Sequence, residues 1–187
     1  VGWTPYDGMT PRISDQPDYF AVPFMPILES SEPGSMAIAA NRQVASIYYD
    51  VEDEKVVAIA AEALRDDIQH VTGLRPEIST DTPQASSAIL IGTLGNSSLI
   101  DGLVKAGKID VSGIRGKWEA YVGAVIDHPL PGVEQALVIV GSDRRGTAFG
   151  VFGLSESIGV SPWYFWSSVP IPEKDALYIA GDHVQPS

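Results

Sequence analysis

The clearest periodicity in this chain lies between residues 57 and 71. Apolar residues recur there at spacings of four, three, four and three, at Val57, Ala61, Leu64, Ile68 and Val71. That spacing places them on one side of an α-helix, and a glycine such as Gly73 directly afterwards is a common helix end. The pattern therefore predicts a helix with one buried face, and either Asp50 or Asp53 can cap its N-terminus.

Shorter apolar and β-branched runs alternate with two further helical patterns. Strands are expected at residues 43–49, 75–79, 88–91, 121–126, 136–140 and 176–180, the last as an edge strand. Helices are expected over residues 97–106 and from Asp143, as the capping residue, to Ile158. Strands interleaved with three helices predict an α/β chain of the α+β type, in which a mixed sheet carries its helices mainly on one face.

The third predicted helix is rich in glycine along one side. Gly146, Gly150, Gly153 and Ser157 follow one another at spacings of four, three and four. Each glycine costs a helix about 1 kcal/mol relative to alanine, so a compensating interaction is needed. We expect this side of the helix to lie unusually close to the element that it covers.

The first 35 residues differ in character from the remainder. They are rich in proline and show no sustained periodicity, which predicts an extended or partly disordered leader over residues 1–35. Phe20, Val22, Phe24 and Ile27 could attach its second half to the body. Residues 36–187 are then expected to form a single α/β domain.

Composition excludes several classes of function. The chain carries 24 acidic and 12 basic residues, for a net charge of −12. Such a chain repels nucleic acid and anionic membranes, so we expect neither as a partner. Cysteine is absent, which excludes disulfides, thiolate catalysis and cysteine-bound zinc. No apolar run approaches the roughly 18 residues that a membrane-spanning helix needs.

A strand, a glycine loop and a helix follow one another at Gly141–Thr147, in the outline of a phosphate-binding loop. A nucleotide-hydrolysing loop ends in Lys followed by Ser or Thr, whereas this chain has Thr-Ala there, so we reject nucleotide hydrolysis. Free N–H groups at the helix start, beside Arg144 and Arg145, could instead hold a carboxylate such as that of a uronic acid. In the alternative interpretation, Asp143 caps the helix and the arginines pair across a domain interface.

Four consecutive aromatic residues follow this helix. They are Trp163, Tyr164, Phe165 and Trp166. They could form a platform on which sugar rings stack. They could equally alternate between two buried surfaces after a turn at Ser161-Pro162, and a consecutive run favours such a packed junction.

The remaining polar clusters do not make an active site. Carboxylates gather at residues 50–54 and at Asp66-Asp67, but neither group has the apolar surroundings that raise the pKa of a glycosidase acid, so both are interpreted as solvated. The three histidines lack metal-binding spacing, and no serine-nucleophile elbow occurs. We expect no metal and no cofactor, and the residues alone indicate no self-sufficient catalytic site.

Longer stretches carry a family resemblance over about four fifths of the chain. The segments concerned are 61–76, 91–95, 105–119, 129–134 and 141–170, including GIRGKWE at 113–119 and GSDRRGTAFGVFGLSESIGVSPWYFW at 141–166. Together they resemble the N-terminal domain of glycoside hydrolase family 115, the xylan α-glucuronidases. Similar small domains precede the TIM barrel of several other glycosidases.

The resemblance implies a function for a larger protein. Family members are secreted, extracellular or periplasmic multidomain enzymes that remove α-1,2-linked glucuronic acid, or its 4-O-methyl form, from xylan with inversion. Their catalytic carboxylates lie in a TIM barrel, which is expected after residue 187, so no catalytic residue is assigned in this chain. The barrel and, through the parent enzyme, glucuronoxylan are the expected partners.

Three hypotheses remain for the chain itself. The leading one is an accessory domain that supports the barrel and is inactive alone, with an exposed apolar patch for the barrel that includes part of the 163–166 cluster. The second is a free-standing carbohydrate-binding module, and the third is an independent enzyme that uses Asp143 with Arg144. If any residues here reach substrate, the candidates are Ser142, Asp143, Arg144, Arg145, Trp163 and Trp166.

Overall fold

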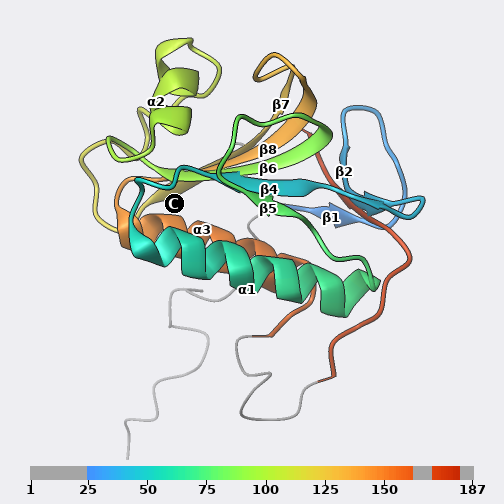
Figure 1. The fold of residues 1–187 in the computed structure, drawn as a ribbon. Helices are drawn as coiled ribbons and strands as arrows, with labels where there is room; N and C mark the ends of the chain where they lie inside the picture. The colour runs from blue at the N-terminus through green and yellow to red at the C-terminus, as the bar shows by residue number, and fades with distance from the viewer. Residues whose placement is uncertain (1–24, 162–169, 182–187) are drawn as a thin grey trace, which may run out of the picture.

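Two β-sheets and three helices form the part of the chain that this computed structural model describes, residues 25–161 and 170–181 (Figure 1). The larger sheet has five strands in the order β5-β4-β6-β8-β7. Its strands are β4 (Ser46–Tyr49), β5 (Ile78–Ser79), β6 (Ala85–Thr93), β7 (Tyr121–Asp127) and β8 (Val133–Gly141). All neighbours are parallel except β7, which pairs antiparallel with β8 at one edge. The predicted α+β class with a mixed sheet is therefore confirmed.

The central strands read as continuous apolar runs because both faces of the sheet are covered. Ile89 and Leu137 point into one core with α1 (Lys55–Thr72) and α3 (Arg144–Ser157). Their neighbours Leu90 and Val138 point into the opposite core with α2 (Ser98–Lys105). Two helices thus lie side by side on one face and one on the other, as Figure 1 shows, so the helices are mainly on one face as predicted.

A second sheet of four antiparallel strands was not foreseen. Its order is β1-β9-β2-β3, from β1 (Ile27–Leu28), β2 (Met36–Ala40), β3 (Gln43–Val44) and β9 (Leu177–Ile179). The prediction of β9 as an edge strand is wrong, because β1 covers its outer side. β1 and the fully buried Met25 lie in residues 25–35, the described part of the expected leader, and this part contributes to the folded unit.

The single strand predicted at residues 43–49 is divided between the two sheets. Asn41 and Arg42 both have positive φ and form the tight turn that pairs β3 with β2. The chain then leaves the small sheet at Ala45, which is buried, and enters the large sheet as β4. Apolar alternation is the same in both sheets, so periodicity alone could not locate this change.

Helix α1 confirms the predicted apolar stripe and corrects the predicted cap. All five residues of the stripe are fully buried, and Gly73 ends the helix in the left-handed conformation with φ of 72°. The N-cap residue is Glu54, whose side chain makes no capping hydrogen bond. Neither Asp50 nor Asp53 occupies the cap position, although an oxygen of Asp53 accepts from the backbone N–H of Glu54 at 2.7 Å.

Two of the four residues on the predicted glycine side of α3, Gly146 and Gly150, lie unusually close to neighbouring elements, whereas Gly153 and Ser157 are only half-buried. A Cβ on Gly146 would stand 2.2 Å from the carbonyl oxygen of Ala120, and one on Gly150 would stand 2.8 Å from Ile139. Both distances are shorter than side chains tolerate, so only glycine allows the observed approach of α3 to β7 and β8.

Candidate functional site at the carboxyl edge of the parallel strands

Four segments meet where the parallel strands end. They are the turns that follow β4, β6 and β8 and the loop of residues 113–119 that precedes β7. The loop reaches the same edge because β7 runs antiparallel to β8 and begins opposite Gly141. Both α1 and α3 start at this edge (Figure 1). Open α/β sheets commonly place ligand contacts here, so the predicted site residues are described at this edge first.

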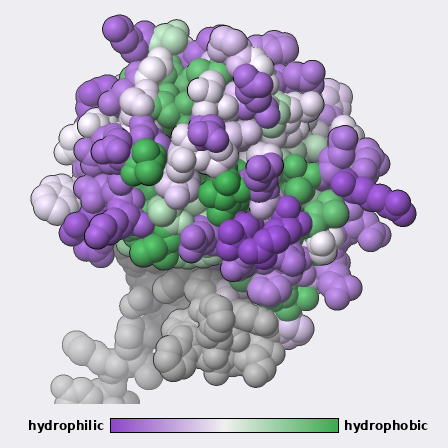
Figure 2. Space-filling view, in the orientation of Figure 1, coloured by the Kyte–Doolittle hydropathy of each residue, from purple (hydrophilic) through white to green (hydrophobic). Residues whose placement is uncertain are grey.

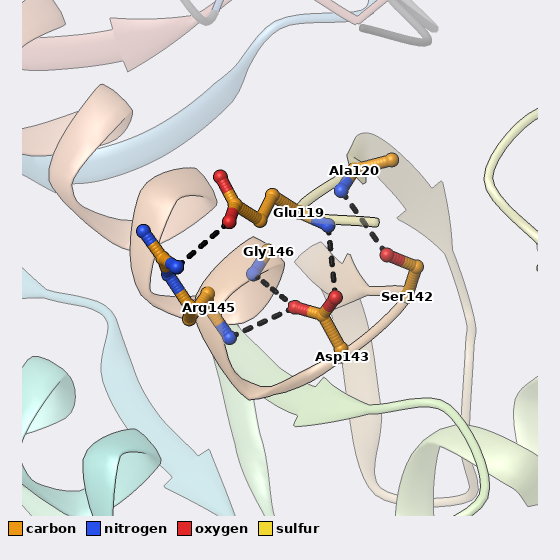
Figure 3. A network of polar contacts seen from close by, with 6 residues as sticks. All are labelled: Glu119, Ala120, Ser142, Asp143, Arg145 and Gly146. Carbon is orange, nitrogen blue, oxygen red and sulfur yellow. Dashed lines mark hydrogen bonds and ion pairs between the residues drawn. The ribbon is translucent and has the colours of Figure 1, made fainter. Parts of the chain in front are cut away.

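Asp143 ties the helix start to the loop, as Figure 3 shows. One carboxylate oxygen accepts from the backbone N–H groups of Arg145 and Gly146, at 2.9 and 2.8 Å. The other accepts from the backbone N–H of Glu119 at 2.8 Å. Burial acts to raise the pKa of Asp143, but these hydrogen bonds outweigh it and hold the pKa below its ordinary value. The Asp143 carboxylate therefore occupies the N-terminus of α3, where an external anion could otherwise bind.

Ser142 and Arg145 strengthen the same junction. The Ser142 hydroxyl accepts a hydrogen bond from the backbone N–H of Ala120 at 3.1 Å. The backbone N–H of Ser142 donates in turn to the Ala120 carbonyl at 2.8 Å. Arg145 pairs with Glu119 at 2.9 Å and lies over the ring of Phe149, 5.8 Å from its centre. Arg145 thus finds its carboxylate within this chain rather than across a domain interface.

Arg144 differs from its neighbour. It is exposed and makes no ion pair or side-chain hydrogen bond to any described residue. It lines a shallow depression between the starts of the two helices, together with Lys55, Val56 and Phe149. The structure therefore brings Ser142, Asp143 and Arg145 into one network and leaves Arg144 open to solvent. Trp163 and Trp166 lie outside the described residues.

Two carboxylates of the 50–54 group are structural, contrary to the expectation that the group is solvated. Asp50 accepts from the backbone N–H of Ser98 at 2.8 Å and from its hydroxyl, and these bonds lower the pKa of Asp50. Asp53 accepts from the backbone N–H of Thr93 at 2.8 Å, and burial raises its pKa despite that bond. Asp50 thereby connects the end of β4 to the start of α2, and Asp53 connects it to the end of β6.

Sequence reasoning did not identify the exposed tryptophan of this edge. Trp118 sits in the loop of residues 113–119 with its side chain 87% exposed, beside the Glu119 that binds Asp143 and Arg145. The loop appears in the sequence only as a run of glycines and charges around one aromatic residue. Nothing in that pattern distinguishes an exposed tryptophan from a buried one.

Other kinds of site are not formed by the described residues. Within residues 25–161 and 170–181, no three His, Asp or Glu side chains gather closely enough to hold a metal ion. Over the same ranges, no helix combines the length and the apolar character of a membrane span. At this edge Asp50, Asp53 and Asp143 accept hydrogen bonds from the chain's own backbone, and Glu119 pairs with Arg145, so each of these four carboxylates is held by a structural contact.

Comparison with solved structures places this fold among the glycosidases. A novel family GH115 4-O-methyl-α-glucuronidase, BtGH115A, described as having specificity for decorated arabinogalactans, is 30% identical to this chain with a TM-score of 0.65. The similarity covers 81% of this chain and 18% of that protein. The chain is therefore a glycoside hydrolase-related domain.

The family resemblance carried by the sequence is confirmed at this point. The chain is a domain related to glycoside hydrolase family 115, and it spans under one fifth of the length of its solved relative, at 18%. A second structure, CpGH84D, is 12% identical with a TM-score of 0.47, covering 88% of this chain and 24% of its own. No protein-family model and no curated protein matches the chain.

Proposed function

We propose that this chain is the N-terminal accessory domain of a glycoside hydrolase that removes α-1,2-linked glucuronic acid, or its 4-O-methyl form, from a plant polysaccharide with inversion. The domain supports a catalytic TIM barrel that follows residue 187, and it is inactive alone. The observation that carries the proposal is the 30% identity to a 4-O-methyl-α-glucuronidase of which this chain covers only 18%. We infer that catalysis belongs to the remaining four fifths of such a protein, which leaves a supporting role for this part.

The chemistry of the described residues supports inactivity of the domain alone. A retaining or inverting glycosidase needs two carboxyl groups that face a sugar across a pocket. Here Asp143 caps a helix, Asp50 binds the start of α2, and Asp53 binds β6. Removing any of them from these roles would leave backbone N–H groups unsatisfied. An independent enzyme built on Asp143 with Arg144 is therefore disfavoured.

The outer side of the two-helix layer supports docking of a further domain. Large apolar side chains are exposed to solvent there: Ile59 is 63%, Phe149 43% and Phe152 46% exposed. Val56 and Phe149 also line a shallow depression. We call these four residues the helix face. In Figure 2 hydrophobic patches interrupt a largely hydrophilic surface over the region where α1 lies in Figure 1. Apolar patches on an acidic domain are typical of surfaces that another domain covers.

The polysaccharide is proposed to be glucuronoxylan, with a decorated arabinogalactan as the alternative substrate. The solved relative is described as specific for decorated arabinogalactans. That relative is named a 4-O-methyl-α-glucuronidase, so 4-O-methyl-glucuronic acid is the part of the substrate on which the two assignments agree. Because such polymers lie outside cells, we place the parent enzyme in a secreted, extracellular or periplasmic location.

A free-standing carbohydrate-binding module is the competing function. It required exposed aromatics at Trp163 and Trp166, which lie outside the described residues. The helix face offers no tryptophan or tyrosine for a sugar to stack on, since its apolar side chains are those of valine, isoleucine and phenylalanine. The two functions predict different behaviour when that face is changed.

Replacing Phe149 and Phe152 with serine tests the accessory role. In the 187-residue chain, the double variant should change the free energy of unfolding by no more than about 1 kcal/mol, because both rings are already half exposed. In the chain extended through its native continuation, loss of the docked apolar surface should separate the domains. Limited proteolysis after residue 187 should then be at least tenfold faster than in the unchanged extended chain.

Val51→Ser is the matched control, because Val51 is 67% exposed in the turn before α1 and is not part of the helix face. It should leave proteolysis of the extended chain unchanged. Equal proteolysis of the Phe149→Ser/Phe152→Ser variant and the unchanged chain would show that no domain docks on this face.

A further inference from the structure

Trp118 exposes more of its surface than any other large apolar side chain of the described residues, at 87%. It is not a member of the helix face, since it lies in the loop that precedes β7 rather than on α1 or α3. An indole ring left in water costs free energy that burial would recover. A ligand that covers the ring therefore gains binding energy without displacing any existing contact.

The backbone beneath Trp118 is fixed from both sides. Ile114 is fully buried in the core under α2, and the backbone N–H of Lys117 donates to its carbonyl at 3.1 Å. On the other side, the backbone N–H of Glu119 donates to Asp143 at 2.8 Å. Gly116 has a φ of 76°, a conformation that glycine adopts without strain. A loop already ordered before binding loses little entropy when a ligand arrives.

The loop that carries Trp118 is locally basic, in a chain whose net charge is −12. Arg115 and Lys117 precede Trp118 in the same loop, both are exposed, and neither pairs with a carboxylate in the described part of the chain. The unpaired Arg144 follows Asp143, which binds the same loop. The nearby acids are already engaged, since Glu119 pairs with Arg145 and Asp143 faces backbone N–H groups. These exposed cations are therefore available to pair with the carboxylate of a ligand.

We propose that the loop of residues 113–119 is a contact site for a uronic-acid-bearing glycan. Trp118 stacks on the apolar face of a sugar ring, and the cations of Arg115 and Lys117 pair with the sugar carboxylate, with Arg144 at the rim. Exposed lysine is depleted in dry protein interfaces, which favours a solvated anionic sugar over a docked domain here. This inference rests on the proposed function, which supplies the glycan class.

Titration calorimetry of the 187-residue chain with glucuronoxylan, and with the same polymer after reduction of its carboxyl groups to alcohols, tests the site. At about 0.15 M salt the Debye length is near 8 Å, so distant acidic residues are screened. The unchanged chain should bind the native polymer at least tenfold more tightly than the reduced one. Trp118→Ala should weaken binding to both polymers at least tenfold, and Arg115→Ala with Lys117→Ala should abolish the preference.

Two controls separate this site from general effects of charge and apolar surface. Lys105→Ala removes an exposed cation at the end of α2, and Phe152→Ala removes a half-exposed ring from the helix face; both should bind like the unchanged chain. Absence of binding at millimolar sugar, equal affinity for the reduced polymer, or unchanged binding by Trp118→Ala would each overturn the site.

Failure of the site and failure of the proposed function give different results. If Trp118→Ala leaves glycan binding intact but speeds proteolysis of the extended chain, the loop is a contact between domains and the proposed glycan site is wrong. If the extended chain releases no glucuronic acid while the loop binds the acidic polymer, the proposed function is wrong and the binding site stands.

Discussion

Asp143 shows how one residue of this chain acts in two elements at once. Its carboxylate satisfies two N–H groups at the start of α3 and a third in the loop that carries Trp118. The capping role could be predicted from sequence, because aspartate directly before a helical pattern is a recognisable signal. The contact with Glu119 could not be predicted, because it joins residues 24 positions apart.

The same limit applies to the acidic residues after β4. Asp50 and Asp53 look like a solvated run in the sequence, yet their partners Ser98 and Thr93 lie 48 and 40 positions away. Only the parallel pairing of β4 with β6 brings these segments together. Trp118 presents the reverse case, since its exposure follows from the packing of the loop beneath it and not from its neighbours in sequence.

Asp143→Ala should lower the free energy of unfolding by about 1–2 kcal/mol near pH 7, because the helix loses its cap and the loop loses its anchor. The pKa of this carboxyl is lowered in the folded state, so its contribution is present above the unfolded-state pKa and is lost as pH falls through the folded-state value. The difference from the unchanged chain should therefore shrink below about pH 4. Urea denaturation at pH 7 and pH 3 measures both effects.

Asp81→Ala is the charge-matched control, because Asp81 is exposed and its carboxylate binds no described residue. Its effect should stay below about 0.5 kcal/mol at both pH values. A destabilisation by Asp143→Ala that grows on acidification would contradict the assigned contacts.

At the level of elements, helices were predicted more securely than strands. The five-residue stripe of α1, the aspartate cap of α3 and the close approach of α3 at Gly146 and Gly150 all appear in the structure. Strand boundaries differ from those predicted. β6 and β8 are longer, with nine residues each, and β5 is shorter, with two. Periodicity indicates which residues are buried, but it does not indicate to which sheet their strand belongs.

Gly146→Ala should destabilise the chain although alanine favours a helix. The added Cβ would meet the Ala120 carbonyl oxygen at 2.2 Å, and backbone at both ends prevents easy relief. Overpacking should outweigh the gain of about 1 kcal/mol in helix propensity and leave a net loss of about 2 kcal/mol or more. The loss should appear as a lower midpoint in urea denaturation.

The control for this change is Gly102→Ala in α2, where a Cβ would meet nothing within 4 Å. That variant should raise the free energy of unfolding by about 0.5–1 kcal/mol. If both substitutions stabilise the chain equally, the close approach of α3 to the sheet is not as described.

At the level of the whole molecule, composition and element order predicted the class but not the architecture. Strands interleaved with three helices indicated an α+β fold with a mixed sheet, whereas the separate antiparallel sheet depends on β1 pairing with β9 from the far end of the chain. The family resemblance came from long stretches rather than from any catalytic motif. That origin is consistent with the described residues, whose carboxylates stabilise the fold.

The open surfaces of the molecule divide by chemistry. The helix face is apolar and is assigned to a docked catalytic domain, while the loop of residues 113–119 is aromatic and cationic and is assigned to an acidic glycan. Both assignments follow from the same account, in which this domain positions substrate and barrel but does not cleave the glycosidic bond.

The most direct test of that account is release of glucuronic acid by the 187-residue chain beside the chain extended through its native continuation. Glucuronoxylan and a decorated arabinogalactan serve as substrates, with free 4-O-methyl-glucuronic acid as the measured product. The account predicts release by the extended chain from at least one polymer, and none by the 187-residue chain. Release by the 187-residue chain itself would contradict it and would place catalytic carboxylates within this domain.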